Sequence, residues 1–527
     1  MPAYRRIAYS FASATALLAA LLFFFKPRWE TNDDVAMSMI AHGYGIAADG
    51  SPPFLMFSNI LWGYLVRLIP EWSGTLGYSS ATVFVLALCG GVFIYGLTRL
   101  GAGRITVVAL VLLTLARPVL FPQFTINSGL LMVAAVLILR LYTQDNRNIT
   151  LSCACMLAFF SFLIRSQEFL FVLVVALPLI SWREIWRRRS AWVCGAILLV
   201  GIAGATVFDR QAYRAPAWDE FNALNPVRAA LTDFRAGDDL RARPDLLQRS
   251  GLTANDIRLV ESWFFVDPRV ADPGALYSML SEIGFTKRSD AGGGAVAALG
   301  ALFNPVLVCL ALAAILLGLL RWNRKIAVAW LLFLAGILAL GLLGRPAVFR
   351  VYIPALTLLL FAPYVIANGS RTVGKLGTAA LVLGAVVNAG IVFSESRAVQ
   401  RVDDVARNAI EELPHVSLVV WGGSFPFQAV YPVIGVDDDG VIDRTNRKIY
   451  GLGVSTLAPF SVAWQEARDG RGLVQRLASL EGVPIMANEL LFGYLKVYCE
   501  ERHRSTLEEL QSASSGPYTL SWRRCRS

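Results

Sequence analysis

Two adjacent carboxylates, Asp33 and Asp34, lie in the segment Thr31-Asn32-Asp33-Asp34, a few residues after the first long apolar run of the chain. A carboxylate at a membrane surface could act as a general base that takes a proton from a hydroxyl or amine as this group attacks a carbon atom. Desolvation by the nearby bilayer would raise the pKa of such a carboxylate, which suits a base. A simpler interpretation is that Thr31 and Asp34 have capping-box spacing, with acidic residues at a helix N-terminus. Asn32 lies between them and is a further site candidate.

Arginine residues near the ends of apolar runs are the second group that could do chemistry. Arg117, Arg165, Arg345 and Arg350 occupy such positions, and Glu168 follows Arg165 closely. The guanidinium group suits bidentate contacts with phosphate. Because charges in or near membrane spans are costly, each of these residues is a functional candidate. The alternatives are an ion pair between Arg165 and Glu168, and snorkelling of the other arginines to lipid headgroups.

Metal ligation receives little support from the sequence. The three histidines, His42, His415 and His503, are scattered along the chain. His42 lies near the aspartate pair and could join its site, although a turn or surface position is the simpler interpretation. The acidic run at residues 437–440 fits a solvated turn better than a calcium site, because the other ligands are not visible. The sequence requires no cofactor, and a divalent cation remains open.

The composition predicts a membrane protein. Hydrophobic residues make up 56% of the chain and charged residues 16%, against about 25% charged residues in soluble domains. The apolar residues gather in runs of about 20, the length at which a helix crosses the hydrocarbon core. About eleven membrane-spanning helices are predicted from these runs. They cover residues 7–25, 78–98, 105–121, 124–141, 149–164, 168–182, 191–208, 296–320, 326–343, 347–366 and 375–393.

The charges of the short loops predict the topology. Basic residues recur in six alternate loops, all on one side of the membrane. Because cytoplasmic loops carry an excess of Lys and Arg, the N-terminus is predicted inside and the C-terminus outside, with the first apolar run as a retained signal anchor. The residues are Arg5, Arg6, Arg99, Arg104, Arg140, Arg147, Arg183, Arg187, Arg188, Arg189, Arg321, Arg324, Lys325, Arg371 and Lys375. The predicted location is the bacterial inner membrane.

The predicted fold is therefore mainly α: a polytopic helical bundle, residues 1–393, followed by a small extracytoplasmic α/β domain, residues 394–527. The first outer loop, residues 26–77, contains an aromatic stretch at 53–70 that suits a helix lying flat on the membrane. The large outer loop, residues 209–295, reads as helical. A capping box is expected there at Thr253 to Asp256.

The α/β domain is predicted from a few local patterns. Residues 416–421 read as a strand that ends in a Gly-Gly turn, 486–498 suit a helix, and 517–523 suit a last strand. Trp421, Gly422, Gly423 and Phe425 could line a sugar-binding surface, but core and turn positions are the simpler interpretation. Cys499 and Cys525 are the two cysteines outside the spans. An oxidising compartment would allow them to pair, although the sequence does not give their separation.

The arrangement resembles the GT-C type glycosyltransferases, integral membrane enzymes that use polyprenyl-phosphate-linked sugars. The resemblance rests on a first span from the cytoplasm, an acidic pair at its outer end, and Pro52-Pro53 before an interfacial helix. It also covers the multi-span body and the C-terminal outer domain. It implies transfer of a sugar from a polyprenyl-phosphate donor to an extracytoplasmic glycan, lipid or protein, in cell-envelope polysaccharide synthesis. In that family an acidic residue of the first outer loop is the catalytic base, so the resemblance implies this role for Asp33 or Asp34, with Asp33 favoured.

The loops support a lipid-linked donor independently of the resemblance. The predicted cytoplasmic loops are all short, so none has room for a domain that binds a nucleotide sugar. No Walker loop, Rossmann fingerprint, HExxH motif or zinc-type cysteine spacing occurs in the sequence, and no nucleic-acid partner is expected. Two other functions remain open: a transporter or flippase, and a non-catalytic envelope-assembly protein. Transporters often show internal repeats and broken paired spans, which the sequence does not display clearly.

Overall fold

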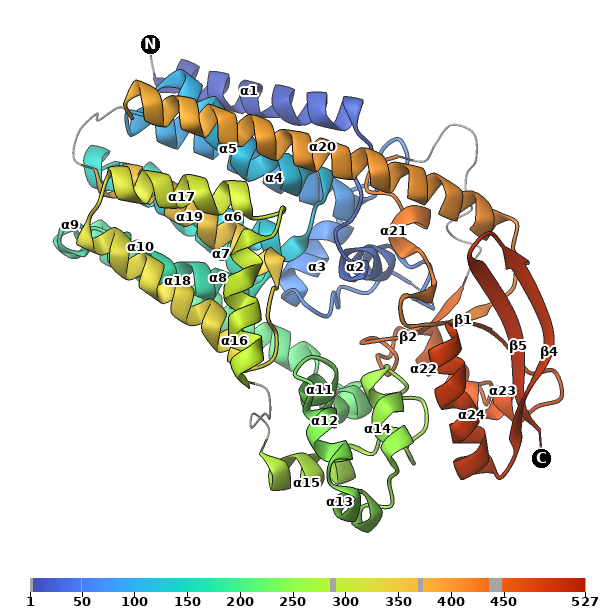
Figure 1. The fold of residues 1–527 in the computed structure, drawn as a ribbon. Coiled ribbons are helices and arrows are strands. Elements are labelled where there is room, and N and C mark those ends of the chain that lie inside the picture. Colours follow the sequence, from blue (N-terminus) through green and yellow to red (C-terminus); the bar gives the residue numbers. More distant parts are fainter. Residues whose placement is uncertain (1–2, 49, 285–290, 368–372, 436–447, 527) are drawn as a thin grey trace.

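The structure is a computed structural model that describes residues 3–48, 50–284, 291–367, 373–435 and 448–526. It is mainly helical, with a bundle of long helices and a separate five-stranded sheet (Figure 1). The long helix α20 leaves the bundle and leads into the sheet domain. We call the end of the bundle nearest to that domain the sheet-side end. The predicted acidic run at 437–440 lies outside the described residues.

Among the described residues, seven helices are long and apolar enough to cross a membrane, or eight if one bent pair counts as a single span. The seven are α1 (Ala3–Phe24), α4 (Gly77–Arg99), α6 (Phe124–Asp145), α10 (Arg189–Ala212), α18 (Arg324–Leu342), α19 (Phe349–Ile366) and α20 (Lys375–Glu411). The bent pair is α16 (Ala291–Gly300) with α17 (Val308–Leu320). Three further apolar helices are shorter, namely α5 (Arg104–Leu120), α7 (Asn148–Ile164) and α8 (Ser166–Ala176).

Every segment that was predicted to span the membrane is thus helical, while the count of eleven spans and the topology stay predictions. The span predicted at 296–320 is covered by two helices that meet at an angle of 84°. The break falls at Asn304-Pro305. Proline cannot continue a hydrogen-bonded helix ladder, and an Asn-Pro pair favours a turn.

Helix α6 forms the centre of the bundle, packed by α4, α7, α8 and α19. Gly129 allows α6 and α19 to approach closely. A Cβ atom at that position would lie 2.3 Å from the Cβ of Pro354 and 3.0 Å from Oε1 of Glu168. The missing side chain therefore sets the distance between α6 and the two helices that carry Glu168 and Arg350.

Two short helices, α2 (Asn32–His42) and α3 (Ile60–Arg67), lie at the sheet-side end of the bundle (Figure 1). The predicted flat helix at 53–70 is shorter than expected, because residues 53–59 form irregular backbone that is bonded to the ends of α7 and α10. Ser58 Oγ donates to the carbonyl of Ile164, and Asn59 Nδ2 donates to that of Ala205. Proline at positions 52 and 53 opposes helix formation there.

The large loop is helical, as predicted. It contains α11 (Asp219–Thr232), α12 (Ala236–Arg241), α13 (Pro244–Arg249), α14 (Ala254–Glu261) and α15 (Pro273–Ile283), while the short α9 (Trp182–Trp186) precedes α10. The capping box at Thr253 and Asp256 is confirmed, with both reciprocal bonds formed. We call the segment from α11 to α15 the loop domain.

The sheet has the strand order β2-β1-β3-β5-β4. Strand β1 pairs in parallel with β2 and β3, whereas β5 pairs antiparallel with β3 and β4. The strands are β1 (Leu418–Trp421), β2 (Ile449–Leu452), β3 (Val483–Met486), β4 (Thr506–Ser515) and β5 (Tyr518–Arg526). The helices are α21 (Phe427–Val430), α22 (Val462–Arg468), α23 (Leu473–Leu477) and α24 (Glu489–His503).

The predicted strands at 416–421 and 517–523 and the predicted helix at 486–498 are confirmed as β1, β5 and α24. Cys499 and Cys525 form a disulfide between α24 and β5. Trp421 and Phe425 are both buried, and Trp421 Nε1 donates to the carbonyl of Ser262 at 2.6 Å. The core interpretation of these two aromatic residues is therefore confirmed.

The loop domain and the sheet domain share one hydrophobic core. Leu259, Phe264 and Leu276 of the loop domain pack in the same cluster as Trp421 and Tyr498 of the sheet domain. An ion pair between Arg502 and the fully buried Asp256 adds a polar link. Because burial of apolar surface is the main stabilising term in folding, these two segments form one structural unit, although helices α16 to α20 separate them in sequence.

Candidate active site at the sheet-side end

Asp33 and Arg350 form an ion pair at the sheet-side end of the bundle. Arg350 Nη1 lies 3.2 Å from Asp33 Oδ2, with the two side chains 25% and 34% exposed. Asp33 lies in the first turn of α2, and Arg350 lies in the first turn of α19. This carboxylate is therefore held in place and remains accessible to a ligand, as a general base must be.

Asp34 has a different environment from its neighbour. Its side chain is fully buried and accepts hydrogen bonds from Thr31 Oγ1, Tyr78 Oη and the backbone N–H of Phe124, each at 3.0 Å. Burial, together with the adjacent charge of Asp33, raises the pKa of Asp34 to about 8, while the three hydrogen bonds act in the opposite direction. Asp34 thus fastens α2 to α4 and α6, and no ligand can reach it.

The capping interpretation of Thr31 to Asp34 places the start of the helix correctly, but the hydrogen bonds of a capping box are not formed. Thr31 is the N-cap of α2, yet its side chain accepts no backbone hydrogen bond from the helix. Its hydroxyl donates to the side chain of Asp34 instead. Asn32 is the first residue of α2 and lies next to Asp33.

Arg165 lies in the turn between α7 and α8, close to the Asp33–Arg350 pair. Its Nη1 donates to the carbonyl of Phe57 at 3.0 Å, and its guanidinium lies over the rings of Phe57 and Phe124. Burial lowers the pKa of Arg165 to about 10, and the positive charges of Arg350 and Arg345 act in the same direction. Mutual repulsion of this kind is relieved when an anion binds between the cations.

Glu168 is buried in the first turn of α8. The alternative of an ion pair between Arg165 and Glu168 is not realised, since no such contact within 4.0 Å joins these two described residues. Oε1 of Glu168 finds no hydrogen-bond partner in the described part of the chain. It lies in the space that Gly129 leaves open. Glu168 is therefore placed behind the arginines rather than in contact with them.

Arg345 approaches the same place from the backbone turn between α18 and α19. Gly344 and Ala347 in this turn have φ values of 80° and 59°. A positive φ is unusual for alanine and marks a position where the surroundings impose the conformation. The guanidinium of Arg345 lies over the ring of Phe234, 5.5 Å from its centre. Within the described residues, Arg345 forms no ion pair.

The loop domain contributes one more cation, Arg228, which the sequence analysis did not single out. Arg228 is buried, lies over the ring of Trp263 and is 3.6 Å from Asp233. Burial lowers its pKa, which Asp233 raises and Arg345 lowers further. No pattern in the sequence identifies Arg228 as a site residue, because it is one of many arginines in a polar helical segment.

Arg117 and His42 lie outside this cluster. Arg117 is buried and bonded by two carboxylates, Glu30 at 2.9 Å and Glu395 at 2.6 Å. His42 Nε2 accepts from the backbone N–H of Tyr78, and burial lowers its pKa to about 4, which keeps the ring neutral. These contacts favour structural roles for both residues. Among the described residues, no group of three metal-ligating side chains is found.

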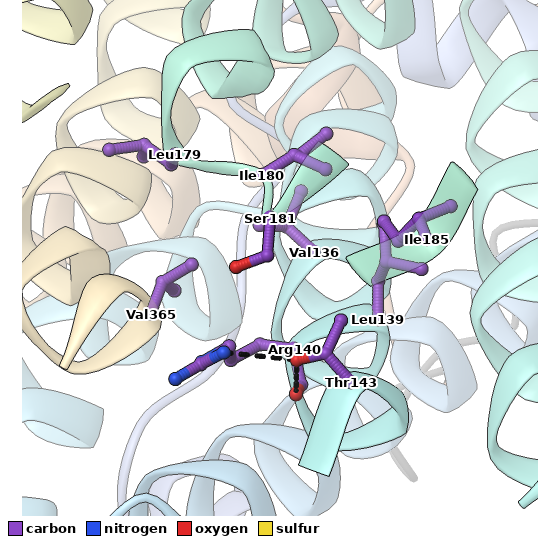
Figure 2. A pocket seen from close by; sticks show the side chains of 9 residues that line it. All are labelled: Val136, Leu139, Arg140, Thr143, Leu179, Ile180, Ser181, Ile185 and Val365. Carbon is purple, nitrogen blue, oxygen red and sulfur yellow. Dashed lines mark hydrogen bonds between the residues drawn. The ribbon is translucent and has the colours of Figure 1, made fainter. Parts of the chain in front are cut away.

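A small cavity lies in the helical bundle between α6 and the chain that connects α8 to α9 (Figure 2). Arg140 and Thr143 line it with apolar side chains such as Leu179 and Val365, and Arg140 Nη1 donates to Thr143 Oγ1. Its volume of about 10 Å³ is that of about one water molecule. It is therefore too small for a sugar or a lipid headgroup.

No family model matches the chain, and no curated protein matches it. Among solved structures, the chain is similar to ArnT from Cupriavidus metallidurans, described as bound to undecaprenyl phosphate. The two chains share 14% sequence identity over 99% of this chain and 98% of the other, with a TM-score of 0.35. At this TM-score the similarity supports no functional argument, so function has to be inferred from the residues of this chain.

Proposed function

We propose that the protein is a membrane glycosyltransferase that moves a sugar from a polyprenyl-phosphate-linked donor to an extracytoplasmic acceptor. The acceptor would be an envelope glycan, a lipid or a protein. The observation that carries the proposal is the accessible Asp33–Arg350 ion pair beside Arg165 and Arg345. It combines a carboxylate with a concentration of guanidinium groups at the end of a membrane bundle, where a lipid-borne phosphate would arrive.

The proposed reaction is a displacement at the anomeric carbon of the donor. The acceptor oxygen or nitrogen forms a bond to this carbon, and the bond from this carbon to the phosphate oxygen breaks. The electron pair leaves with the polyprenyl phosphate, and the proton of the acceptor passes to Asp33 as general base. Arg165, Arg345 and Arg350 would stabilise the negative charge that develops on the leaving phosphate.

The ion pair suggests an order of events. Asp33 and Arg350 pair with each other at 3.2 Å. A donor phosphate that binds Arg350 would weaken this pair and leave Asp33 available to accept a proton. Donor binding would therefore activate the base, so that an acceptor arriving before the donor would meet a carboxylate already engaged by arginine.

The disulfide in the sheet domain supports the predicted orientation. Disulfides persist in oxidising compartments such as the bacterial periplasm and are rare in the cytosol. Cys499 and Cys525 are paired, whereas the remaining five cysteines, all in or near the apolar helices, are free thiols. We accordingly place the sheet domain and the candidate site outside the cytoplasm, in a multi-pass protein of the plasma membrane.

The test is complementation of a deletion strain with the wild-type protein, Asp33→Asn or Asp34→Asn, followed by analysis of envelope glycan composition. We expect deletion to remove a sugar. Asp33→Asn should fail to restore it at normal membrane abundance, because an amide cannot accept the proton. Asp34→Asn should restore it in proportion to its abundance. Asp469→Asn, an exposed change in the sheet domain, is the matched control.

The other outcomes distinguish the rival functions. If Asp33→Asn restores the glycan, Asp33 is not the general base and the proposed transferase mechanism at this site is wrong. If deletion instead leads to accumulation of an intact lipid-linked sugar on the cytoplasmic side, a flippase is favoured. If only the abundance of other envelope enzymes falls, a non-catalytic assembly role is favoured.

A further inference from the structure

A basic and aromatic segment lies between α8 and α10, at the end of the bundle opposite to the sheet domain (Figure 1). It contains the short helix α9, and the candidate membrane span α10 begins directly after it, at Arg189. We call residues 182–192 the α9 turn. Because it connects directly to a candidate span, this turn lies at one end of the membrane-crossing part of the chain.

The α9 turn is anchored to the C-terminal end of α6. Arg188 donates from Nη1 to the carbonyl of Tyr142 at 2.7 Å and from Nη2 to that of Thr143 at 2.9 Å, and its guanidinium lies over the ring of Tyr142. Tyr142 Oη is 2.8 Å from Ser190 Oγ. Arginine commonly bonds the last carbonyl groups of a helix in this way. Arg188 therefore serves the fold, and the turn has a defined position on the bundle.

Three tryptophans of the α9 turn form one continuous exposed surface. The ring centres of Trp182 and Trp186 are 6.5 Å apart, and those of Trp186 and Trp192 are 5.5 Å apart. Trp182 Nε1 donates to the carbonyl of Leu177 and Trp192 Nε1 to that of Trp186, which orients both rings. The three residues are 41%, 61% and 58% exposed. Tryptophan is enriched at the headgroup level of membranes because its ring is amphipathic.

Three arginines of the same turn carry charges that are not balanced within the described part of the chain. Arg183, Arg187 and Arg189 are exposed, and none of them forms an ion pair or side-chain hydrogen bond with another described residue. Glu184, the one acidic residue of the turn, lies 3.9 Å from Arg140 of α6. Arg183 and Arg187 are four positions apart on helical backbone, so their Cβ atoms lie about 5–6 Å apart on one face.

The exposed surface of α10 continues from this turn. Val193, Ile197 and Val200 follow each other at intervals of four and three residues, so they share one face of α10, and all three are exposed. Exposed apolar side chains on a membrane span contact lipid acyl chains. An anionic lipid would therefore find guanidinium groups, indole rings and an apolar helix face next to one another. A nucleic acid or an acidic protein has no part that fits the apolar face.

We propose that the α9 turn binds an anionic phospholipid, with the phosphate beside Arg183 and Arg187 and the acyl chains along the exposed face of α10. Basic segments next to a membrane span attract anionic lipids, and guanidinium groups bind phosphate through paired N–H donors. A zwitterionic lipid brings its own cation, which the arginines repel, so the site selects a headgroup without an ammonium. This proposal is independent of the proposed function.

The experiment uses the purified full-length protein, equilibrated with equal amounts of phosphatidylglycerol, phosphatidylethanolamine and phosphatidylcholine and analysed by native mass spectrometry. The wild-type protein should retain phosphatidylglycerol in preference to the other two lipids. In the double variant Arg183→Gln, Arg187→Gln, this preference should fall about fivefold for each arginine removed. Thermal unfolding of this variant in detergent should match that of the wild type, because neither arginine contacts another described side chain.

The matched control is the double variant Arg99→Gln, Arg104→Gln. It removes the same charge from another predicted cytoplasmic loop, residues 99–104, which contains no tryptophan. This variant should keep the lipid preference of the wild type. Trp186→Ala should lower the total amount of bound lipid and keep the preference among headgroups, because the ring contributes apolar contact rather than charge.

Four results would overturn the proposal. The first is absence of any preference in the wild-type protein, or an unchanged preference in Arg183→Gln, Arg187→Gln. The second is an equal loss in Arg99→Gln, Arg104→Gln, which would mean that net charge alone selects the lipid. The third is displacement of the lipid by glycerophosphoglycerol at equal concentration, because the headgroup alone would then suffice. The fourth is displacement by oligothymidylate at equal concentration, which would favour a nucleic acid as the partner.

Discussion

At the residue scale, Asp33 and Asp34 show how two adjacent carboxylates acquire different roles. Consecutive residues of a helix point in directions about 100° apart. Asp33 thus faces Arg350, and Asp34 faces the interior, where three donors surround it. The accessible residue can exchange a proton with a ligand. The enclosed residue positions the helix that carries its neighbour.

The pKa of Asp34 predicts a pH dependence of stability. Burial raises this pKa from 3.8 to about 8. The unfolded chain therefore releases the proton at lower pH than the folded chain, so this contribution to stability is full below about pH 4 and is lost as the pH rises from about 4 to about 8. The thermal midpoint of the purified protein should decrease between about pH 5 and about pH 8 and change little from this group at higher pH. Asp34→Asn should lose this part of the pH dependence of the thermal midpoint. If the midpoint of that variant falls with pH as steeply as that of the wild type, Asp34 is not the group responsible.

Arg350 gives a second prediction at this scale. Arg350→Lys keeps a positive charge beside Asp33 but loses the planar fork that suits phosphate. In a transfer assay, the KM for the lipid-linked donor should rise about tenfold, with little change in thermal stability. Arg324→Lys, at the exposed start of α18, provides the control. An equal KM in Arg350→Lys and wild type would mean that Arg350 does not contact the donor.

At the element scale, close approach between α6 and α19 brings Arg350 to α2. Gly129→Ala would place a methyl group 2.3 Å from the Cβ of Pro354. Overpacking of this kind should cost about 1–3 kcal/mol and displace Arg350 from Asp33. Gly195→Ala in α10, where the added Cβ meets nothing within 4 Å, is the matched control. Thermal unfolding and donor KM should both change in the first variant alone.

The disulfide between α24 and β5 supports a prediction for the sheet domain. It closes a loop between residues 26 positions apart, and constraining the unfolded chain in this way is worth about 3 kcal/mol. The double variant Cys499→Ser, Cys525→Ser should therefore be cleaved faster in the sheet domain by limited proteolysis. The bundle should keep its own protease resistance. Equal cleavage rates with and without the disulfide would show that it adds no stability.

The sequence predicted the helices and strands better than the contacts between them. Long apolar runs, the capping box at Thr253 and the strand at 416–421 carry local signals, and each is confirmed. Asp33 and Arg350 are 317 residues apart, and their contact depends on packing through α6, which no local pattern reveals. The break at Asn304-Pro305 had a local signal, which the strong hydrophobicity of residues 296–320 obscured.

At the scale of the whole molecule, the loop domain and the sheet domain stabilise each other through their shared core. Asp256→Ala would leave Arg502 without its buried partner and should cost about 3–5 kcal/mol. Because the core is common, both segments should become sensitive to protease together, which peptide mapping would reveal. Glu282→Ala, which removes exposed ion pairs with Arg249 and Arg243, should leave both segments resistant. Loss of one segment alone would contradict a single unit.

The common core also constrains the order in which the protein can be made. The loop domain leaves the ribosome before α16 to α20 exist, and the residues that complete its core lie at the far end of the chain. Its apolar face must remain uncovered while the rest of the bundle is synthesised and inserted. We expect this exposed apolar face to attract chaperones during the interval, because large exposed apolar patches associate with other proteins. A product truncated before β1 would keep that face exposed and become a substrate for membrane proteases.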